Sequence, residues 1–100
     1  IASWLGRPAR AAAVATYATS NIRINVVAPG LVDTPGAAGI VGSDMARKAS
    51  EAMHALGRIG QPEDVAPLAA LLLSDQSGWT TGQVFGVDGG LATLKTRVKV

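Results

Sequence analysis

Several features are absent from this sequence, and each absence excludes a class of protein. No cysteine occurs in the 100 residues, which excludes disulfides and thiolate metal sites and predicts a cytoplasmic location. No apolar run reaches the roughly 18–20 residues that span a bilayer, so we expect no membrane association. A net charge of +2, without a dense Lys/Arg stripe or interleaved aromatic residues, predicts no nucleic-acid partner.

The start of the chain also lacks familiar signals. The first residue is Ile1, not an initiator methionine, and the segment after it does not have the pattern of a signal peptide. The glycine-rich fingerprint that cradles a dinucleotide pyrophosphate is missing from the whole sequence. We therefore expect that the chain is part of a longer protein.

Apolar residues make up 48% of the chain, which argues against disorder and predicts a single small domain over 1–100. Helix patterns alternate with runs of β-branched residues. This order predicts an α/β fold in which buried strands form a parallel sheet. The expected helices cover residues 8–19, 44–56 and 62–73, and the expected strands cover residues 22–28 and 83–87.

The helix signals differ in strength. Ser43 is placed to cap the second helix, and the third begins at Pro62 with two acidic residues in its first turn. Pro67 lies inside the third helix and is expected to kink or shorten it. The small residues 36–42 show no periodicity and are expected to form a loop. The tail from residue 94 is expected to be frayed.

The most informative segment is the first strand together with the loop that follows it. The strand ends at Pro29-Gly30, and a free hydroxyl, Thr34, follows within four residues. In open α/β sheets, ligands bind where the chain leaves the carboxyl end of a strand. Gly30 allows a flat ring to approach the backbone, and peptide groups near Val32 can pair with a carboxamide.

Three segments together resemble the C-terminal half of a short-chain dehydrogenase/reductase. Residues 22–35 resemble the sixth strand and nicotinamide loop of that family, Gly57-Arg-Ile-Gly-Gln-Pro-Glu-Asp-Val65 resembles the entry to its penultimate helix, and residues 82–90 resemble its last strand. The resemblance implies a partial Rossmann-like, doubly wound parallel sheet that contains only the C-terminal strands and helices. It also implies NAD or NADP as cofactor and hydride transfer on an alcohol or ketone.

The resemblance assigns roles along the whole chain. Residues 1–21 are a remnant of the catalytic segment, 22–35 the strand and nicotinamide loop, 36–57 the substrate lid, 58–90 the last helix and strand, and 91–100 a tail. The cofactor contacts that it implies are Pro29, Gly30, Val32 and Thr34.

The catalytic residues implied by the resemblance are Ser3 and Tyr17. In the family's Tyr-x-x-x-Lys motif the lysine lowers the tyrosine pKa, but Asn21 occupies the lysine position here and cannot supply that charge. Two alignments remain open. In one, a helix of about twenty residues has been removed after Tyr17; in the other, residues 4–20 are that helix and Tyr17 is a packing residue.

Three hypotheses about function follow. The chain is the C-terminal part of an oxidoreductase that is inactive alone, or a non-catalytic interaction fragment, or a degenerate product that folds poorly. Segments resembling residues 62–75 and 83–87 form subunit interfaces in the family, so a homo-oligomer is expected. His54 has no second metal ligand in view, so no metal site is predicted, and Asp33 and Asp88 are expected to be turn or cap residues.

Overall fold

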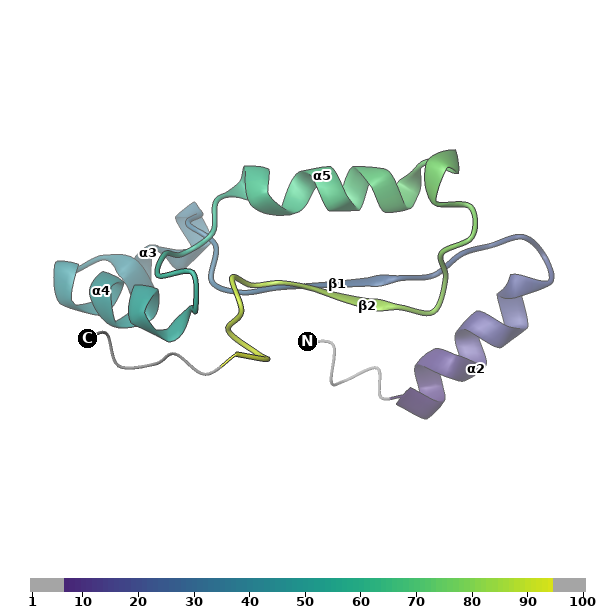
Figure 1. Cartoon of the computed structure of the whole chain (residues 1–100), viewed down its shortest axis with the longest axis horizontal. Helices are drawn as coiled ribbons and strands as arrows, with labels where there is room; N and C mark the ends of the chain where they lie inside the picture. Colours follow the sequence, from purple (N-terminus) through teal and green to yellow (C-terminus); the bar gives the residue numbers. More distant parts are fainter. Residues whose placement is uncertain (1–6, 95–100) are drawn as a thin grey trace. The chain divides into compact units, whose positions relative to one another are not determined.

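The structure, a computed structural model, describes residues 7–94 of the chain (Figure 1). It contains four α-helices, two short 3-10 helices, labelled η, and two strands within those residues. In chain order the elements are α2 (Arg7–Ala18), β1 (Val26–Pro29), η1 (Pro35–Ala37), α3 (Ala38–Val41), α4 (Asp44–Met53), α5 (Pro62–Leu73), η2 (Asp75–Ser77) and β2 (Val84–Val87).

The three predicted helices are present. Ser43 caps α4, because its hydroxyl accepts a hydrogen bond from the Ala46 N–H at 3.1 Å. The helix ends at Met53, three residues before its predicted end, because His54 takes an extended backbone conformation. Helix α5 runs without interruption from Pro62 to Leu73, so the predicted shortening at Pro67 is wrong. Pro67 is the sixth residue of α5, so its missing N–H removes the one hydrogen bond that would run to the Glu63 carbonyl, and the helix continues on both sides of it.

Two other local predictions are also corrected. Residues 36–42 form η1 and α3, not a loop; Pro35 stands in the first turn of η1, and the Thr34 carbonyl accepts from the Ala37 N–H at 2.9 Å. Strand β1 begins at Val26, not residue 22. The Asn25 amide donates to the Thr80 carbonyl and accepts from the Gln83 N–H, both at 3.1 Å, so side-chain bonds replace regular pairing there.

Strands β1 and β2 form a two-stranded sheet. The Val26 N–H donates to the Gln83 carbonyl at 2.8 Å, and the Gly30 N–H donates to the Val87 carbonyl at 3.0 Å. Partner numbers rise together along both strands, so the pairing is parallel, as the sequence predicts. Figure 1 shows the two strands side by side, and helix α5 stands between them in the chain.

The chain divides into two compact units. The first comprises residues 1–28 and 67–85, and the second comprises residues 29–66 and 86–100. Both strands and α5 run from one unit into the other.

In the first unit, Asn21 explains how α2 ends. Its φ of 59° places it in the left-handed region, where asparagine is tolerated better than most residues. The Asn21 N–H donates to the Ala18 carbonyl at 3.0 Å, and the Ile22 N–H donates to the Tyr17 carbonyl at 3.2 Å. These two bonds make a Schellman motif. Asn21 therefore ends a helix at this position.

Arg23 links several segments of the first unit. Its guanidinium donates to the Ser74 carbonyl at 3.0 Å, the Ser77 hydroxyl at 3.0 Å and the Thr80 carbonyl at 3.2 Å. The Ser77 hydroxyl, which is buried, in turn donates toward the Leu71 carbonyl at 2.8 Å. The network satisfies carbonyl groups at the end of α5, which have no partner within the helix.

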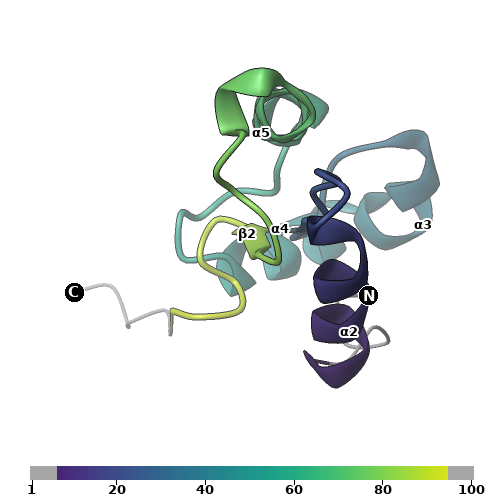
Figure 2. The same ribbon diagram turned by 90° about the vertical axis from the view of Figure 1, so that its right-hand side faces the viewer.

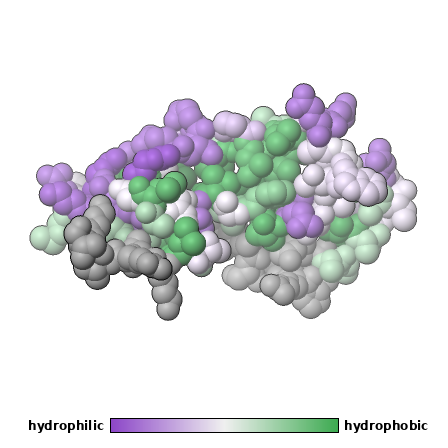
Figure 3. Space-filling view, viewed as in Figure 1, coloured by the Kyte–Doolittle hydropathy of each residue, from purple (hydrophilic) through white to green (hydrophobic). Residues whose placement is uncertain are grey.

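Apolar burial is slight in the described residues. Ala37 and Ile59 are the buried hydrophobic side chains there, and both belong to the second unit. In the first unit Trp79 is fully exposed and Leu73 is 87% exposed. Figure 3 shows apolar atoms gathered over the region of α5, and Figure 2 shows this helix end-on above β2. The first unit thus keeps an open apolar surface.

No helix within residues 7–94 has both the length and the apolar character required to cross a membrane.

Candidate functional site

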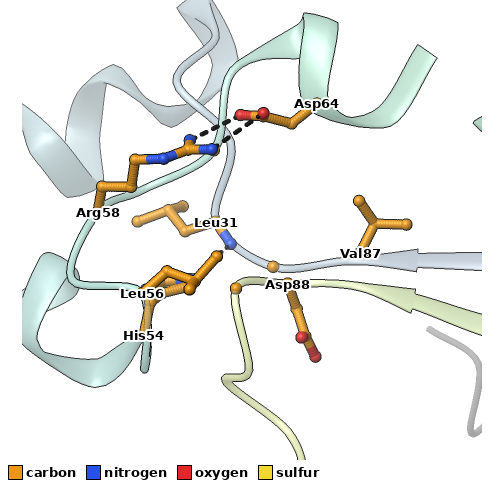
Figure 4. Close-up of a pocket in the computed structure, with 10 residues that line it drawn as sticks. Leu31, His54, Leu56, Arg58, Asp64, Val87 and Asp88 are labelled. Atoms are coloured by element: carbon orange, nitrogen blue, oxygen red, sulfur yellow. Dashed lines mark hydrogen bonds and ion pairs between the residues drawn. The ribbon is translucent and has the colours of Figure 1, made fainter. Parts of the chain in front are cut away.

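A cavity of about 160 Å³ lies in the second unit, beside the loop that follows β1 (Figure 4). The loop is anchored at its start, because the Gly30 N–H donates to the Val87 carbonyl at 3.0 Å. Four segments contribute lining residues: the loop, the turn after α4, the start of α5 and the end of β2. These residues are Gly30, Leu31, His54, Leu56, Arg58, Gly60, Asp64, Val87, Asp88 and Gly89.

Backbone hydrogen bonds join residues 31–33 of the loop to Gly60 along one edge of the loop. The Gly60 N–H donates to the Leu31 carbonyl at 2.8 Å, and the Asp33 N–H donates to the Gly60 carbonyl at 2.9 Å. This is a parallel bridge between Val32 and Gly60. In a parallel bridge of this kind, the N–H and C=O of the residue between the two bonds point away from the partner. The N–H and C=O of Val32 therefore point away from Gly60, and neither makes a hydrogen bond within residues 7–94.

His54 fixes the peptide group between Gly30 and Leu31. The side chain is 3% exposed, and its Nε2 accepts a hydrogen bond from the Leu31 N–H at 3.2 Å. Its Nδ1 lies 2.7 Å from the Ser50 carbonyl oxygen. One histidine thus joins the loop to the last turn of α4. A lone histidine after a helix carries no sequence signal for this role, and sequence analysis missed it.

Gly30 has a reason within the protein to be glycine. A Cβ at this position would lie 2.9 Å from His54 Nε2 and 3.0 Å from the Asp88 Cα. Contacts that short are not tolerated, so any side chain would displace the histidine or the end of β2. The predicted close approach to Gly30 is therefore made by His54 and Asp88 in this structure. A cofactor contact at Gly30 stays a prediction.

A bidentate ion pair fixes the turn that leads into α5. The Arg58 Nη1 and Nη2 atoms lie 2.7 Å and 3.0 Å from the two carboxylate oxygens of Asp64. The Asp64 carboxylate also accepts from the Gln61 N–H at 2.7 Å, in the manner of a helix capping box. The hydrogen bond from Arg58, supported by the bond from Gln61, lowers the pKa of Asp64 to about 2. The pair is therefore ionised across the physiological range.

Two other aspartates have distinct roles. Asp88 has the predicted turn role, because its carboxylate accepts from the Gly90 N–H at 2.9 Å and the Ala92 N–H at 3.2 Å. The expectation for Asp33 is wrong. Its carboxylate lies 3.3 Å from the Arg47 guanidinium on α4 and makes no cap. The loop and α4 are thus joined by an ion pair as well as by His54.

The predicted site residues divide between the two units. Pro29, Gly30, Val32 and Thr34 all belong to the second unit, and the Thr34 side chain is exposed and makes no hydrogen bond within residues 7–94. Tyr17 belongs to the first unit, near the end of α2, and is 49% exposed. Ser3 lies outside the described residues. The catalytic roles of Ser3 and Tyr17 stay predictions.

A family model described as "Enoyl-(Acyl carrier protein) reductase" matches residues 6–92. Together with the parallel strands and the loop after β1, this match shows that the chain belongs to the short-chain dehydrogenase/reductase family. Among curated relatives, it is 46% identical over 71 residues to the 3-oxoacyl-[acyl-carrier-protein] reductase FabG of Thermotoga maritima, a match that covers 71% of this chain and 28% of the relative. It is 47% identical over 85 residues to the cis-4-hydroxycyclohexanecarboxylate dehydrogenase of Sinomonas cyclohexanicum, covering 85% of this chain and 33% of the relative.

Solved structures show the same fold. A short-chain dehydrogenase family protein from Francisella tularensis is 35% identical with a TM-score of 0.75, over 88% of this chain and 40% of that protein. A 4-hydroxyisoleucine dehydrogenase complexed with NADH is 25% identical with a TM-score of 0.80, over 89% of this chain and 37% of that protein. The Rossmann-like fold class predicted from the sequence is confirmed. The matches to these two curated relatives span about a third of each relative's length.

Proposed function

We propose that this chain supplies the nicotinamide-binding part of an NAD(P)-dependent oxidoreductase that acts on an alcohol or ketone. The observation that carries the proposal is the bridge between Val32 and Gly60. Because it occupies only one side of the loop, a peptide N–H and a peptide C=O of Val32 are left facing outward. A donor and an acceptor on one residue match the amide group of nicotinamide, which carries one acceptor and two donor hydrogens.

The neighbouring residues fit the same ligand. The Thr34 side chain is exposed, and its hydroxyl is available to an amide or a phosphate oxygen. Val32 is half-buried, so it offers an apolar contact without being closed off from a ligand. When bound, the cofactor supplies or accepts a hydride. The residues of this chain hold its nicotinamide end through Val32 and Thr34.

Asn21 bears on proton transfer in this chain. By the family pattern Tyr17 exchanges a proton with the substrate oxygen and Ser3 donates a hydrogen bond to that oxygen. Asn21 stands where the family has lysine, and it forms the end of α2. An asparagine provides no positive charge to lower the tyrosine pKa. We therefore infer that the 100-residue chain binds a cofactor weakly and turns over no substrate by itself, in a cytoplasmic setting.

The test is a titration of the chain with NADH and NADPH, followed by nicotinamide fluorescence beside a circular dichroism melt. A Thr34→Val variant is expected to bind about five- to tenfold more weakly, because one hydrogen bond of about 1 kcal/mol is lost. Thr19→Val is the matched control, since Thr19 is exposed and lies in the turn after α2. Equal affinities for both variants and the unmodified chain would contradict the proposed role of Thr34. A cooperative melt without saturable binding would reject the proposed function.

A second candidate is a non-catalytic role in association, for which the open apolar surface of the first unit is the evidence. Leu71, Leu73 and Val84 are 43%, 87% and 39% exposed, and they fall in the two segments, 62–75 and 83–87, expected to form a homo-oligomer. Burying such side chains is favourable by about 25 cal/mol per Å² of apolar surface. Chemical cross-linking of the chain to itself and to an intact relative tests this role. Recovery of monomer alone at high concentration would reject it.

A further inference from the structure

His54 is a buried polar side chain to which the proposed function assigns no role. The sequence contains a single histidine, and in the structure its side chain is 3% exposed. Both ring nitrogens contact backbone groups, and these groups come from residues 19 positions apart: the Leu31 N–H in the loop and the Ser50 carbonyl in α4. A residue placed this way controls the geometry between the two segments.

The partners of the ring determine its protonation. Leu31 presents an N–H, which can only donate, so Nε2 must carry a lone pair. Ser50 presents a carbonyl oxygen, which can only accept, so Nδ1 must carry the hydrogen. A single form of the ring satisfies both contacts, namely the neutral imidazole with its hydrogen on Nδ1.

The contact with His54 fixes the first peptide group of the loop, because the Leu31 N–H belongs to the peptide group between Gly30 and Leu31. The next two peptide groups, on either side of Val32, are fixed by Gly60, whose N–H donates to the Leu31 carbonyl at 2.8 Å and whose carbonyl accepts from the Asp33 N–H at 2.9 Å. His54 and Gly60 thus hold successive peptide groups of the same loop. Gly30 leaves room for the ring, since a Cβ there would lie 2.9 Å from Nε2.

We infer that His54 is a positioning residue for the nicotinamide loop, and that it acts only as the neutral Nδ1–H imidazole that joins Leu31 to Ser50. The inference depends on the proposed function only for its consequence, namely that cofactor affinity follows the state of this residue. The contacts themselves exist whether or not a cofactor binds.

Protonation would break the arrangement. An imidazolium has hydrogens on both nitrogens, so Nε2–H would face the Leu31 N–H and the bond between them would be lost. Nearby charged groups are already engaged: Asp88 accepts from two backbone N–H groups, and Asp64 is paired with Arg58. On α4, Arg47 is paired with Asp33 and with Glu51. The carboxylates of Asp88, Asp64 and Asp33 are thus already bonded to other groups.

The first experiment measures the ring directly. In long-range ¹H–¹⁵N spectra of the labelled 100-residue chain, the one histidine gives one pair of ring nitrogens without ambiguity. We expect hydrogen on Nδ1 and a lone pair on Nε2 at neutral pH. As the ring becomes protonated, the Leu31 amide resonance is expected to shift and its hydrogen exchange to accelerate. A ring with its hydrogen mainly on Nε2, or a Leu31 amide that ignores the titration, would overturn the inference.

The second experiment separates the two contacts by substitution. In His54→Gln the carbonyl oxygen can reach the position of Nε2 and accept from Leu31, whereas in His54→Asn the shorter amide reaches only the position of Nδ1. We expect His54→Asn to weaken NADH binding about tenfold and His54→Gln to restore most of the affinity. Equal losses in both variants would show a general packing role and reject positioning through Leu31.

The two proposals fail in different ways. If the unmodified chain does not bind NADH, the proposed function is rejected for this chain, but the ring spectra still decide whether His54 holds Leu31. If NADH binds and the hydrogen is on Nε2, the proposed function stands and the inference about His54 fails.

Discussion

The two units of the chain are stabilised in different ways. In the second unit, three polar contacts join neighbouring segments: Arg58 with Asp64, Arg47 with Asp33, and His54 with Leu31. In the first unit, apolar side chains of α5 and Trp79 remain open, and the side chains of Arg23 and Asn25 join the segment before β1 to residues after α5. The candidate site lies in the second unit, so these contacts determine the geometry of the site. The first unit instead leaves apolar side chains exposed.

The largest effect is expected from Gly30→Ala in the second unit. The added Cβ would stand 2.9 Å from His54 Nε2 and 3.0 Å from the Asp88 Cα, and the latter is backbone that cannot rotate away. We expect a loss of about 2–3 kcal/mol in the free energy of unfolding, typical of overpacking, measured by urea denaturation. NADH binding should fall with it.

Gly39→Ala is the matched control for this change. A Cβ at Gly39 would have no atom within 4 Å, and the residue lies within α3, where alanine is the better helix former. We expect a neutral or slightly stabilising effect. If Gly30→Ala were as stable as Gly39→Ala, the close contacts around His54 would not exist in solution.

A smaller effect is expected from Arg23→Met in the first unit. The substitution keeps much of the aliphatic length but removes donors to two carbonyls and one hydroxyl in the segment that follows α5. We expect a loss of about 1–2 kcal/mol, since hydrogen bonds to a charged donor are stronger than neutral ones. Arg23→Lys should recover only part, because one ammonium cannot replace a fork of two nitrogens. An unchanged urea midpoint for Arg23→Met would show that the contacts of Arg23 with the segment after α5 do not contribute to stability.

The ion pair at the start of α5 predicts a pH dependence. Because Arg58 and Gln61 lower the pKa of Asp64 to about 2, the folded state binds its proton less readily than the unfolded chain does. Its stabilisation is therefore complete above the unfolded pKa of about 3.9 and is lost as the pH falls toward 2. The difference in melting temperature between the unmodified chain and Asp64→Asn should shrink over that range.

Glu63→Gln is the control for the pH experiment. Glu63 stands in the same helical turn, is exposed, and makes no ion pair within residues 7–94. Its difference from the unmodified chain should not follow the titration of Asp64. A constant difference for Asp64→Asn from pH 5 to pH 2 would show that the pair does not form in solution.

Much of the fold follows from local sequence signals. The Ser43 cap, the acidic first turn of α5 and the β-branched residues of β1 each act within a few residues, and the helices and strands appear where those signals stand. The parallel pairing agrees with the sequence prediction, but the predicted burial of the strands is wrong, because no residue of β1 or β2 is buried. Contacts between distant residues could not be predicted this way.

The candidate site shows where sequence reasoning stops. Gly30 is assigned to a ligand from sequence, yet its short contacts are with His54 and Asp88, which lie 24 and 58 residues away. Asp33 is assigned to a turn, yet it pairs with Arg47 on α4. Both errors have one cause. The residue type restricts which local backbone geometries are possible, but tertiary packing determines which distant residue makes the contact.

The smallest effect on the isolated fold is expected from Trp79→Ser in the first unit. The side chain is fully exposed, so its removal should leave the free energy of unfolding of the monomer within about 0.5 kcal/mol. If the first unit needs a partner, the unmodified chain should gain melting temperature with concentration, and Trp79→Ser should lose that gain. Sedimentation velocity at two concentrations measures the same difference. Trp79 lies between the two expected interface segments, 62–75 and 83–87, whereas Tyr17, 49% exposed on α2, precedes both, so Tyr17→Ser is the control and should still associate. Association that survives in Trp79→Ser would move the interface away from this residue, and a melting temperature independent of concentration would show that the exposed apolar side chains of α5 need no partner.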